Sequence, residues 1–227
     1  MTIELCAPIT ASTFEQALNL LRKAEAKNAD LIEFRLDYMN SIPALKELVS
    51  ATRLPKIATN RPYSEGGKFR GKESERIKLL LEAARTGFQY VDIELGIDDV
   101  VDVVRRIRKV GVETIVSYHN FETTPNLQEF ERILEKQLST GADICKIVST
   151  ARELRDNLGI LEFVSNSSRK SKIVSFAMGE LGVVSRILSP IYGASFTFAS
   201  IERGAESAAG QLTIDEVKEI YRSMRLE

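Results

Sequence analysis

Short β-rich runs alternate with amphipathic helical stretches along all 227 residues of the chain. The runs that predict strands are residues 2–7, 31–36, 56–60, 90–95, 114–119, 144–149, 172–176 and 195–198. The stretches that predict helices are residues 12–27, 42–51, 73–86, 98–109, 127–139, 151–165, 179–190 and 214–225. Strands that alternate with helices favour parallel pairing, and eight parallel strands can close into a barrel that has no edges. We therefore predict a (β/α)8 barrel of the TIM type, with residues 1–227 as a single domain.

Capping residues and glycines separate the predicted elements. Ser12-Thr-Phe-Glu15 and Thr213-Ile-Asp-Glu216 both fit the capping-box pattern at a helix start. Gly87, Gly111 and Gly141 fall where a helix should end before the next strand. An open doubly wound sheet is the alternative fold, but no Gly-x-Gly-x-x-Gly turn follows the first predicted strand.

Charge and composition indicate a globular protein whose main partner is not a nucleic acid. The chain is 44% hydrophobic and 28% charged, with 31 Lys and Arg against 32 Asp and Glu. The basic residues are spread through the predicted helices, and nucleic-acid binding usually requires them to be clustered. The most basic stretch, Lys68-Phe-Arg-Gly-Lys72, is interpreted as a solvated loop.

The sequence also predicts a cytoplasmic location. We find neither a signal-peptide pattern nor an apolar run long enough to span a membrane. Cys6 and Cys145 lack the spacing of a metal site or a redox motif, and two cysteines are too few for a disulfide scaffold.

Two predicted strands carry charged residues at alternate positions. In the second, Glu33, Arg35 and Asp37 would face the barrel interior, because strand side chains alternate between the two faces. Asp92 and Glu94 repeat this pattern in the fourth. These groups form either internal ion pairs or a hydrogen-bonding wall for a polar ligand. Three of the carboxylates could in principle hold magnesium, but a single histidine and scattered acids make a metal site a poor expectation.

A lysine and a histidine are the most informative chemical pair. Lys146 lies inside the apolar run Asp143-Ile-Cys-Lys-Ile-Val148, although lysine is among the residues least often buried. His119, the only histidine, ends the preceding predicted strand. Neighbouring parallel strands would bring both to the same edge of the sheet. The pair suits imine chemistry, in which the lysine binds a carbonyl and the histidine moves a proton.

Further candidates follow the third strand and lie in the seventh helix. Arg61 and Glu65 stand in a Pro- and Gly-containing segment after the third strand, where the loops of such a barrel carry the site. Arg186, among apolar residues, is either a surface residue with a buried stem or a bidentate clamp for a carboxylate.

These residues, in this order, resemble the type I 3-dehydroquinate dehydratase family, and the resemblance covers essentially the whole chain. It rests on Glu33-Phe-Arg-Leu-Asp37, Arg61 with Glu65-Gly-Gly67, His119-Asn-Phe121, Lys146, Arg186 and Ser207-Ala-Ala-Gly-Gln211. It implies a hydro-lyase that converts 3-dehydroquinate to 3-dehydroshikimate, the third step of the shikimate pathway to chorismate and the aromatic amino acids. It also implies a homodimer, without a cofactor or metal.

The resemblance further implies a role for each site residue. Lys146 would form the imine, and His119 would act as acid and base with the help of Glu65. Arg186 would hold the substrate carboxylate. The remaining positions would contact the ring hydroxyls or lie on a loop that closes over the site; they are Glu33, Arg35, Arg61, Ser207 and Gln211.

Two other functions remain as alternatives. A class I aldolase on the same barrel would also use a buried lysine, but many such enzymes bind phosphate, and Ala177-Met-Gly-Glu-Leu-Gly182 places a glutamate where a phosphate would be repelled. A barrel that only binds a sugar acid would need no lysine inside a strand, so this alternative explains Lys146 poorly.

Overall fold

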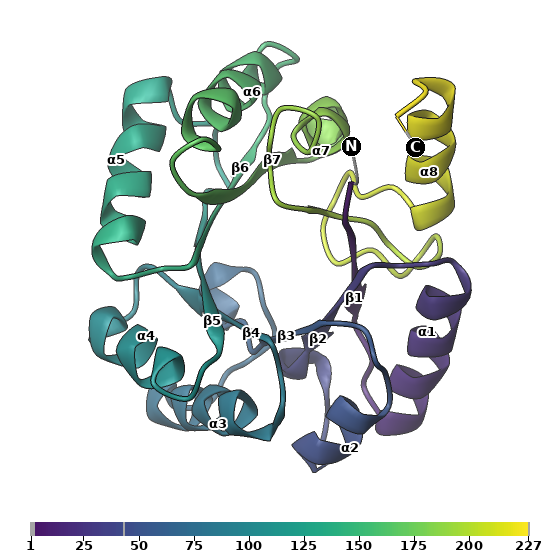
Figure 1. Ribbon diagram of the computed structural model, residues 1–227, viewed down its shortest axis with the longest axis vertical. Helices are drawn as coiled ribbons and strands as arrows, with labels where there is room; N and C mark the ends of the chain where they lie inside the picture. The colour runs from purple at the N-terminus through teal and green to yellow at the C-terminus, as the bar shows by residue number, and fades with distance from the viewer. Residues whose placement is uncertain (1–2, 43, 227) are drawn as a thin grey trace.

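The computed structural model describes residues 3–42 and 44–226 as a nearly closed barrel of eight parallel strands (Figure 1), which confirms the predicted (β/α)8 fold. The strands are β1 (Leu5–Ile9), β2 (Leu31–Arg35), β3 (Lys56–Thr59), β4 (Tyr90–Glu94), β5 (Glu113–His119), β6 (Ile144–Thr150), β7 (Lys172–Met178) and β8 (Thr197–Phe198). Each strand from β1 to β7 pairs with its neighbour in sequence, and β8 pairs with β1. Thr2 and Pro43, which belong to a predicted strand and a predicted helix, lie outside the described residues.

The seam between β7 and β8 is the weakest part of the barrel wall. The strand predicted at 195–198 contains only two residues in the ladder, Thr197 and Phe198, and both pair with β1. On the other side, the backbone N–H of Ser195 donates to the carbonyl of Ile173 at 2.7 Å. This hydrogen bond links the segment before β8 to β7.

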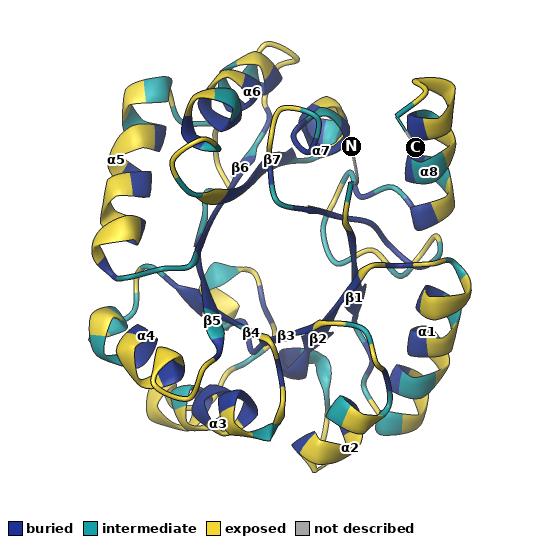
Figure 2. Ribbon diagram, in the orientation of Figure 1, coloured by how far each residue is buried: buried dark blue, intermediate teal, exposed yellow. Residues whose placement is uncertain are grey.

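Helices surround the strands and bury one face each against them (Figure 2). They are α1 (Phe14–Ala26), α2 (Leu45–Ser50), α3 (Glu73–Thr86), α4 (Val100–Arg108), α5 (Leu127–Ser139), α6 (Asp156–Ser167), α7 (Val183–Leu188) and α8 (Ile214–Ser223). Short 3-10 turns follow three strands, as η1 (Leu36–Tyr38), η2 (Tyr63–Glu65) and η3 (Glu180–Gly182).

Several helices start later than predicted. The helix predicted from residue 151 begins at Asp156, whose carboxylate accepts the backbone N–H groups of Arg152 and Glu153 and stabilises a turn there. The helix predicted at 179–190 is divided into η3 and α7. The N-cap of α1 is Thr13, whose side chain accepts the N–H of Gln16, so the capping box predicted at Ser12–Glu15 is wrong.

Other local predictions are correct. Thr213 and Glu216 form a full capping box at the start of α8. Gly87, Gly111 and Gly141 have φ values of 109°, 81° and 86°, the left-handed conformation that glycine adopts most easily. By contrast, the predicted end of the first strand, at residue 7, is wrong: β1 continues through Pro8 to Ile9, with Pro8 in register with Glu33 of β2.

The barrel interior is apolar at the amino ends of the strands and carries both charged and apolar side chains at the carboxyl ends. One buried cluster at the amino ends of the strands includes Cys6, Leu31, Ile57 and Ile144. Glu33 and Lys146, further along their strands, point into a pocket. On the outer side of β2, Ile32 and Phe34 pack in the core beneath the helices, as the strand alternation predicts.

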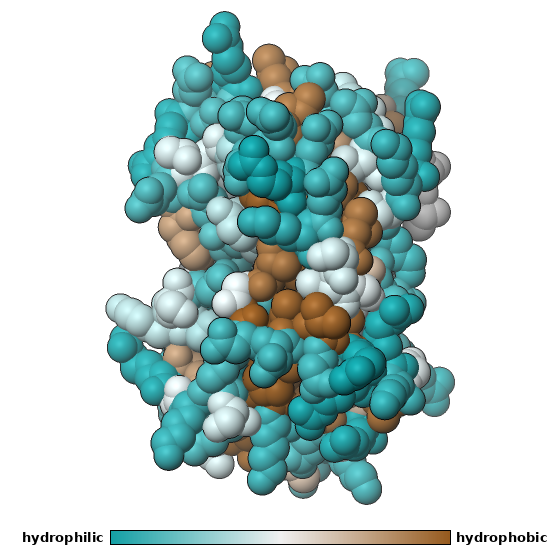
Figure 3. All heavy atoms as spheres, turned by 90° about the vertical axis from the view of Figure 1, so that its left-hand side faces the viewer, coloured by the Kyte–Doolittle hydropathy of each residue, from teal (hydrophilic) through white to brown (hydrophobic). Residues whose placement is uncertain are grey.

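The outer surface is mostly polar. Figure 3 turns the side on which α4 and α5 lie toward the viewer and shows an apolar strip across the middle of that face. Among the described residues, no helix combines the length and the apolar character that crossing a membrane requires.

Candidate active site

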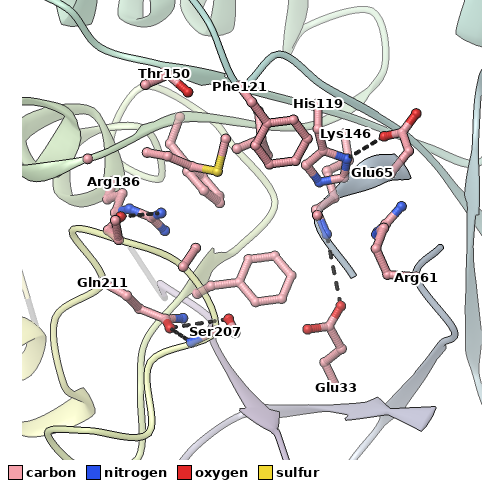
Figure 4. Close-up of a pocket in the computed structure, with 18 of the residues that line it drawn as sticks. Glu33, Arg61, Glu65, His119, Phe121, Lys146, Thr150, Arg186, Ser207 and Gln211 are labelled. Carbon is pink, nitrogen blue, oxygen red and sulfur yellow. Dashed lines mark hydrogen bonds and ion pairs between the residues drawn. The ribbon is translucent and has the colours of Figure 1, made fainter. Parts of the chain in front are cut away.

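A pocket of about 340 Å³ opens at the carboxyl ends of the strands, where a barrel of this type carries its site. All nine site residues predicted from the sequence line this pocket (Figure 4). They are Glu33, Arg35, Arg61, Glu65, His119, Lys146, Arg186, Ser207 and Gln211. Residues from β2 to β8 thus converge on one cavity although they are spread over most of the chain.

Lys146 is held in the pocket by charges on neighbouring strands. It is 5% exposed, and its Nζ lies 3.0 Å from Asp92 Oδ2 and 3.9 Å from Glu33 Oε1. The ring centre of Phe198 is 4.5 Å from the same nitrogen. Behind the strand, the buried amide of Gln137 donates to the carbonyls of Val116 and Lys146, both at 2.9 Å. The lysine therefore has a fixed backbone and a neutralised charge.

His119 and Glu65 form the second part of the site. The imidazole Nδ1 lies 3.2 Å from Glu65 Oε2, and Phe121 stacks against the imidazole with a centroid separation of 6.0 Å. Burial, together with the charges of Arg61 and Lys146, holds the pKa of His119 well below its usual value. The imidazole is therefore neutral near pH 7, and with Nδ1 donating to Glu65 its Nε2 is free to accept a proton.

Glu65 is itself close to its titration point at neutral pH. Burial, opposed by Arg61 and reinforced by Glu94 and Asp92, raises the pKa of Glu65 to about 7. The Glu65 carboxyl therefore changes its ionisation near neutral pH, directly beside the imidazole of His119.

A tight turn after β3 places Glu65 beside His119. Gly66 at the end of η2 has φ of 73°, and a side chain there would meet the ring of Phe121 at 2.6 Å. At Gly67, an added Cβ would lie 2.0 Å from the carbonyl oxygen of Arg61. The Gly-Gly pair thus lets the chain fold back closely enough for the carboxylate to reach the imidazole.

Arg61 lies at the centre of a buried ion-pair network. Its guanidinium donates at 2.7 Å to Asp92, to Glu94 and to the hydroxyl of Ser117. Burial disfavours the ionised form of Asp92, but the charges of Arg61 and Lys146 and the hydrogen bond from Ser117 outweigh it and lower the pKa of Asp92. Asp92 and Glu94 are thus internal ion-pair partners, and their contact with cations argues against the magnesium alternative.

Arg35 takes part in a separate ion pair. Its guanidinium donates to both carboxylate oxygens of Asp37, at 2.9 and 2.7 Å. This is the internal pair that the sequence left open, yet Arg35 also lines the pocket. The internal ion pair is confirmed, and Asp37 orients an arginine that faces the cavity; contact of this arginine with a ligand stays a prediction.

Arg186 is the unsatisfied cation of the pocket. It is 3% exposed and has no carboxylate partner among the described residues; its only hydrogen bond there is to the carbonyl of Ala209, at 3.3 Å. Within the described part of the chain, neither its Nε nor Nε2 of the adjacent Gln211 has a hydrogen-bond partner. Burial lowers the pKa of Arg186 to about 10. A buried arginine beside an unpaired amide indicates an anion-binding position.

The sequence reasoning missed several residues around the pocket. The apolar side of the wall contains Val148, Phe176, Met178 and Phe198, which the pattern of strand residues alone did not distinguish from ordinary core. Arg76 was also missed: it is fully buried on α3 and contacts Glu94 at 2.6 Å. Its position on the buried side of a predicted helix is the signal that would have revealed it.

Comparison with known proteins agrees with this geometry. The family model described as type I 3-dehydroquinase matches residues 5–227. The chain belongs to the type I 3-dehydroquinase family. This confirms the resemblance found in the sequence.

Relatives of this type I 3-dehydroquinase have similar lengths. A 3-dehydroquinate dehydratase of Dehalococcoides mccartyi is 39% identical over 207 residues, which cover 91% of this chain and 90% of that protein. The crystal structure of the Geobacillus kaustophilus 3-dehydroquinate dehydratase has a TM-score of 0.91 at 26% identity, covering 99% of this chain and 92% of that one. The type I enzyme of Clostridium difficile, solved with covalently modified comenic acid, has a TM-score of 0.89 at 26% identity, with 98% and 92% covered.

The raised pKa of Glu65 predicts a pH-dependent effect of Glu65→Gln on stability. Because the folded state binds this proton more tightly than the unfolded chain, the contribution of Glu65 to stability falls as the pH rises from about 4.5 to about 7. We therefore expect Glu65→Gln to gain stability relative to the parent protein between pH 4.5 and pH 8. Denaturant unfolding of both proteins at these two pH values measures the change, and an equal difference at both would contradict it.

Proposed function

We propose that this type I 3-dehydroquinase removes water from 3-dehydroquinate through an imine on Lys146 and yields 3-dehydroshikimate, with residues 1–227 as one catalytic domain. This hydro-lyase reaction is the third step of the shikimate pathway. The observation that carries the proposal is a buried lysine in one pocket with a neutral histidine and an arginine that lacks an anion. The relatives named 3-dehydroquinate dehydratase and the covalent adduct in the Clostridium difficile structure support it.

The substrate is a β-hydroxy ketone with a carboxylate, and each of these groups has a counterpart in the pocket. Arg186 and Gln211 have unused donors for the carboxylate. Glu33, Arg35 and Arg61 form the opposite wall, which suits the ring hydroxyls. Ser207 hydrogen-bonds to Gln211 and so holds the amide on the carboxylate side. Binding at both ends fixes the ring between the lysine and the histidine.

Covalent catalysis solves the main chemical difficulty, which is the weak acidity of the proton next to the ketone. The neutral amine of Lys146 attacks the ketone carbon, and the carbonyl oxygen leaves as water with one hydrogen of the amine and one proton taken from solvent, which gives a protonated imine. Nε2 of His119 removes the adjacent proton, and its electrons move to the imine nitrogen. The resulting enamine expels the β-hydroxyl group, to which His119 returns a proton. Water then hydrolyses the imine and frees Lys146.

Glu65 supports the proton transfers of His119. As a carboxylate it accepts the Nδ1 hydrogen and stabilises the imidazolium that forms when Nε2 takes a proton. Each step uses a side chain of the pocket, so the proposed reaction needs neither a cofactor nor a metal.

Lys146→Ala and His119→Ala separate the covalent step from proton transfer. We expect Lys146→Ala to lose turnover and to form no adduct when 3-dehydroquinate and borohydride are added. His119→Ala should still give the adduct on Lys146, with turnover lowered by about 10²–10⁴-fold. Intact-mass and peptide mapping identify the modified residue. Normal turnover in Lys146→Ala would exclude the imine mechanism.

Arg186→Lys tests the carboxylate contact. A lysine keeps the charge but cannot form two parallel hydrogen bonds, so we expect kcat/KM to fall by about 10- to 100-fold. Arg106→Lys, an exposed arginine on α4, is the matched control and should retain the parent value. Equal kinetic constants for Arg186→Lys and the parent enzyme would place the carboxylate elsewhere.

We also propose that the enzyme is a cytoplasmic homodimer. The family resemblance and the apolar strip of Figure 3 support a self-association surface, and Val101 on α4 and Leu138 on α5 are exposed apolar residues on that side. Light scattering should give twice the 25.4 kDa of one chain. Leu138→Glu should shift the protein toward the monomer, whereas a monomeric parent protein would contradict the proposal.

A further inference from the structure

Asp92 makes the shortest polar contact of the Lys146 side chain, although it does not line the pocket. Its Oδ2 lies 3.0 Å from Nζ, and its side chain is 1% exposed. Glu33 is the other nearby carboxylate, but it is 3.9 Å away and its Oε1 already accepts from Thr59 at 2.8 Å. Asp92 therefore reaches the nitrogen of Lys146 from within the barrel rather than from the pocket lining.

The two oxygens of Asp92 have different partners. Oδ1 accepts from Arg61 at 2.7 Å and from Ser117 at 2.6 Å. Oδ2 faces the nitrogen of Lys146. The hydrogen bonds to Oδ1 stabilise the ionised form of the carboxylate. Oδ2 remains available to pair with a positive charge on the Lys146 nitrogen.

We propose that Asp92 is the counter-ion of the protonated imine, and hence a further catalytic residue of the dehydration. This inference rests on the proposed function. When the C–N bond forms, the carbonyl oxygen leaves as water with one hydrogen of the amine and one proton from solvent, and the nitrogen keeps one hydrogen and a positive charge. Asp92 Oδ2 accepts that hydrogen, just as it accepts one from the free lysine.

The surroundings of the nitrogen explain why a counter-ion is needed. The cations near it are Arg35 on β2, Arg61 after β3 and Arg186 on α7, with His119 on β5 in its neutral form. The other acidic groups are Cys6 on β1, Glu33 on β2, Glu94 on β4 and Glu65 on η2. Glu94 is paired with Arg61 and Arg76, and Glu65 with His119. Asp92 is thus the carboxylate that directly balances the imine charge.

Protonation of the imine controls the rate of the next step. A neutral imine is a weak electron acceptor, so His119 could not remove the adjacent proton readily. In the free enzyme the same carboxylate accepts a hydrogen bond from Lys146 Nζ. Removal of the Asp92 charge should therefore leave imine formation intact and reduce imine protonation. A residue with a purely structural role would affect imine formation and imine protonation together.

Asp92→Asn tests this assignment, because the amide preserves the shape of the side chain and removes its charge. Borohydride reduces the total imine formed with 3-dehydroquinate, whereas cyanoborohydride reduces the protonated form. We expect similar total adduct on Lys146 in Asp92→Asn and the parent enzyme. The protonated fraction should decline at a pH about 1–3 units lower in the variant, the usual size of a close opposite-charge effect.

Ser117→Ala provides a second, milder variant for the case in which Asp92→Asn does not fold, as judged by circular dichroism. It removes one of the two hydrogen bonds that orient Oδ1 and keeps the carboxylate, so Oδ2 is held less firmly beside the nitrogen and the protonated fraction should shift in the same direction by a smaller amount. Unchanged pH profiles in the folded variants would overturn the role proposed for Asp92 and would leave the imine mechanism in place. If the parent enzyme gave no adduct with either reagent, the proposed imine mechanism itself would fail.

Discussion

The buried pairing of Arg61 with Asp92 and Glu94 is the interaction on which the rest of the site depends. Strand β4 and the segment after β3 supply these charges, and each would be costly to bury without the others. Removal of one member of such a pair typically destabilises a protein by about 3–5 kcal/mol, because its partner is left buried and uncompensated. The same network places a carboxylate beside Lys146 and a positive charge near His119 and Glu65. Stability and acid–base chemistry are therefore linked in this half of the barrel.

The amino-terminal half of the barrel interior stabilises the fold, and the carboxyl-terminal half carries the candidate active site. Apolar side chains fill the amino-terminal end and contribute hydrophobic stabilisation without polar atoms that need partners. This leaves the carboxyl-terminal end free to hold charges, an unpaired arginine and an open pocket. A site that keeps buried donors unsatisfied must be supported by surrounding structure, and the apolar half and the helix layer supply that support.

Much of the fold and the site could be predicted from the sequence, for physical reasons that differ between residues. Strand alternation placed Glu33 and Arg35 on the inner face, because side chains two apart in a strand must share a face. The burial of Lys146 followed from its apolar neighbours. The pairing of Arg61 with Asp92, and the contact of Arg76 with Glu94, depend on strand register and on a helix-to-strand distance that no local pattern contains. The start of α6 depended on the side chain of Asp156, which competes with the helix for backbone N–H groups.

The seam between β7 and β8 is a place where a bound ligand would stabilise the barrel. Arg186 follows β7, while Gln211 lies on the loop after β8, and across the seam the carbonyl of Ala209 accepts from Arg186 and from the N–H of Gly179. An anion held by both side chains would add a non-covalent cross-link where the strand ladder is shortest. Occupied enzyme would then resist thermal opening of the barrel better than empty enzyme, by mass action on the closed form. Abundance of the substrate in the cell would thereby influence the lifetime of the enzyme as well as its rate.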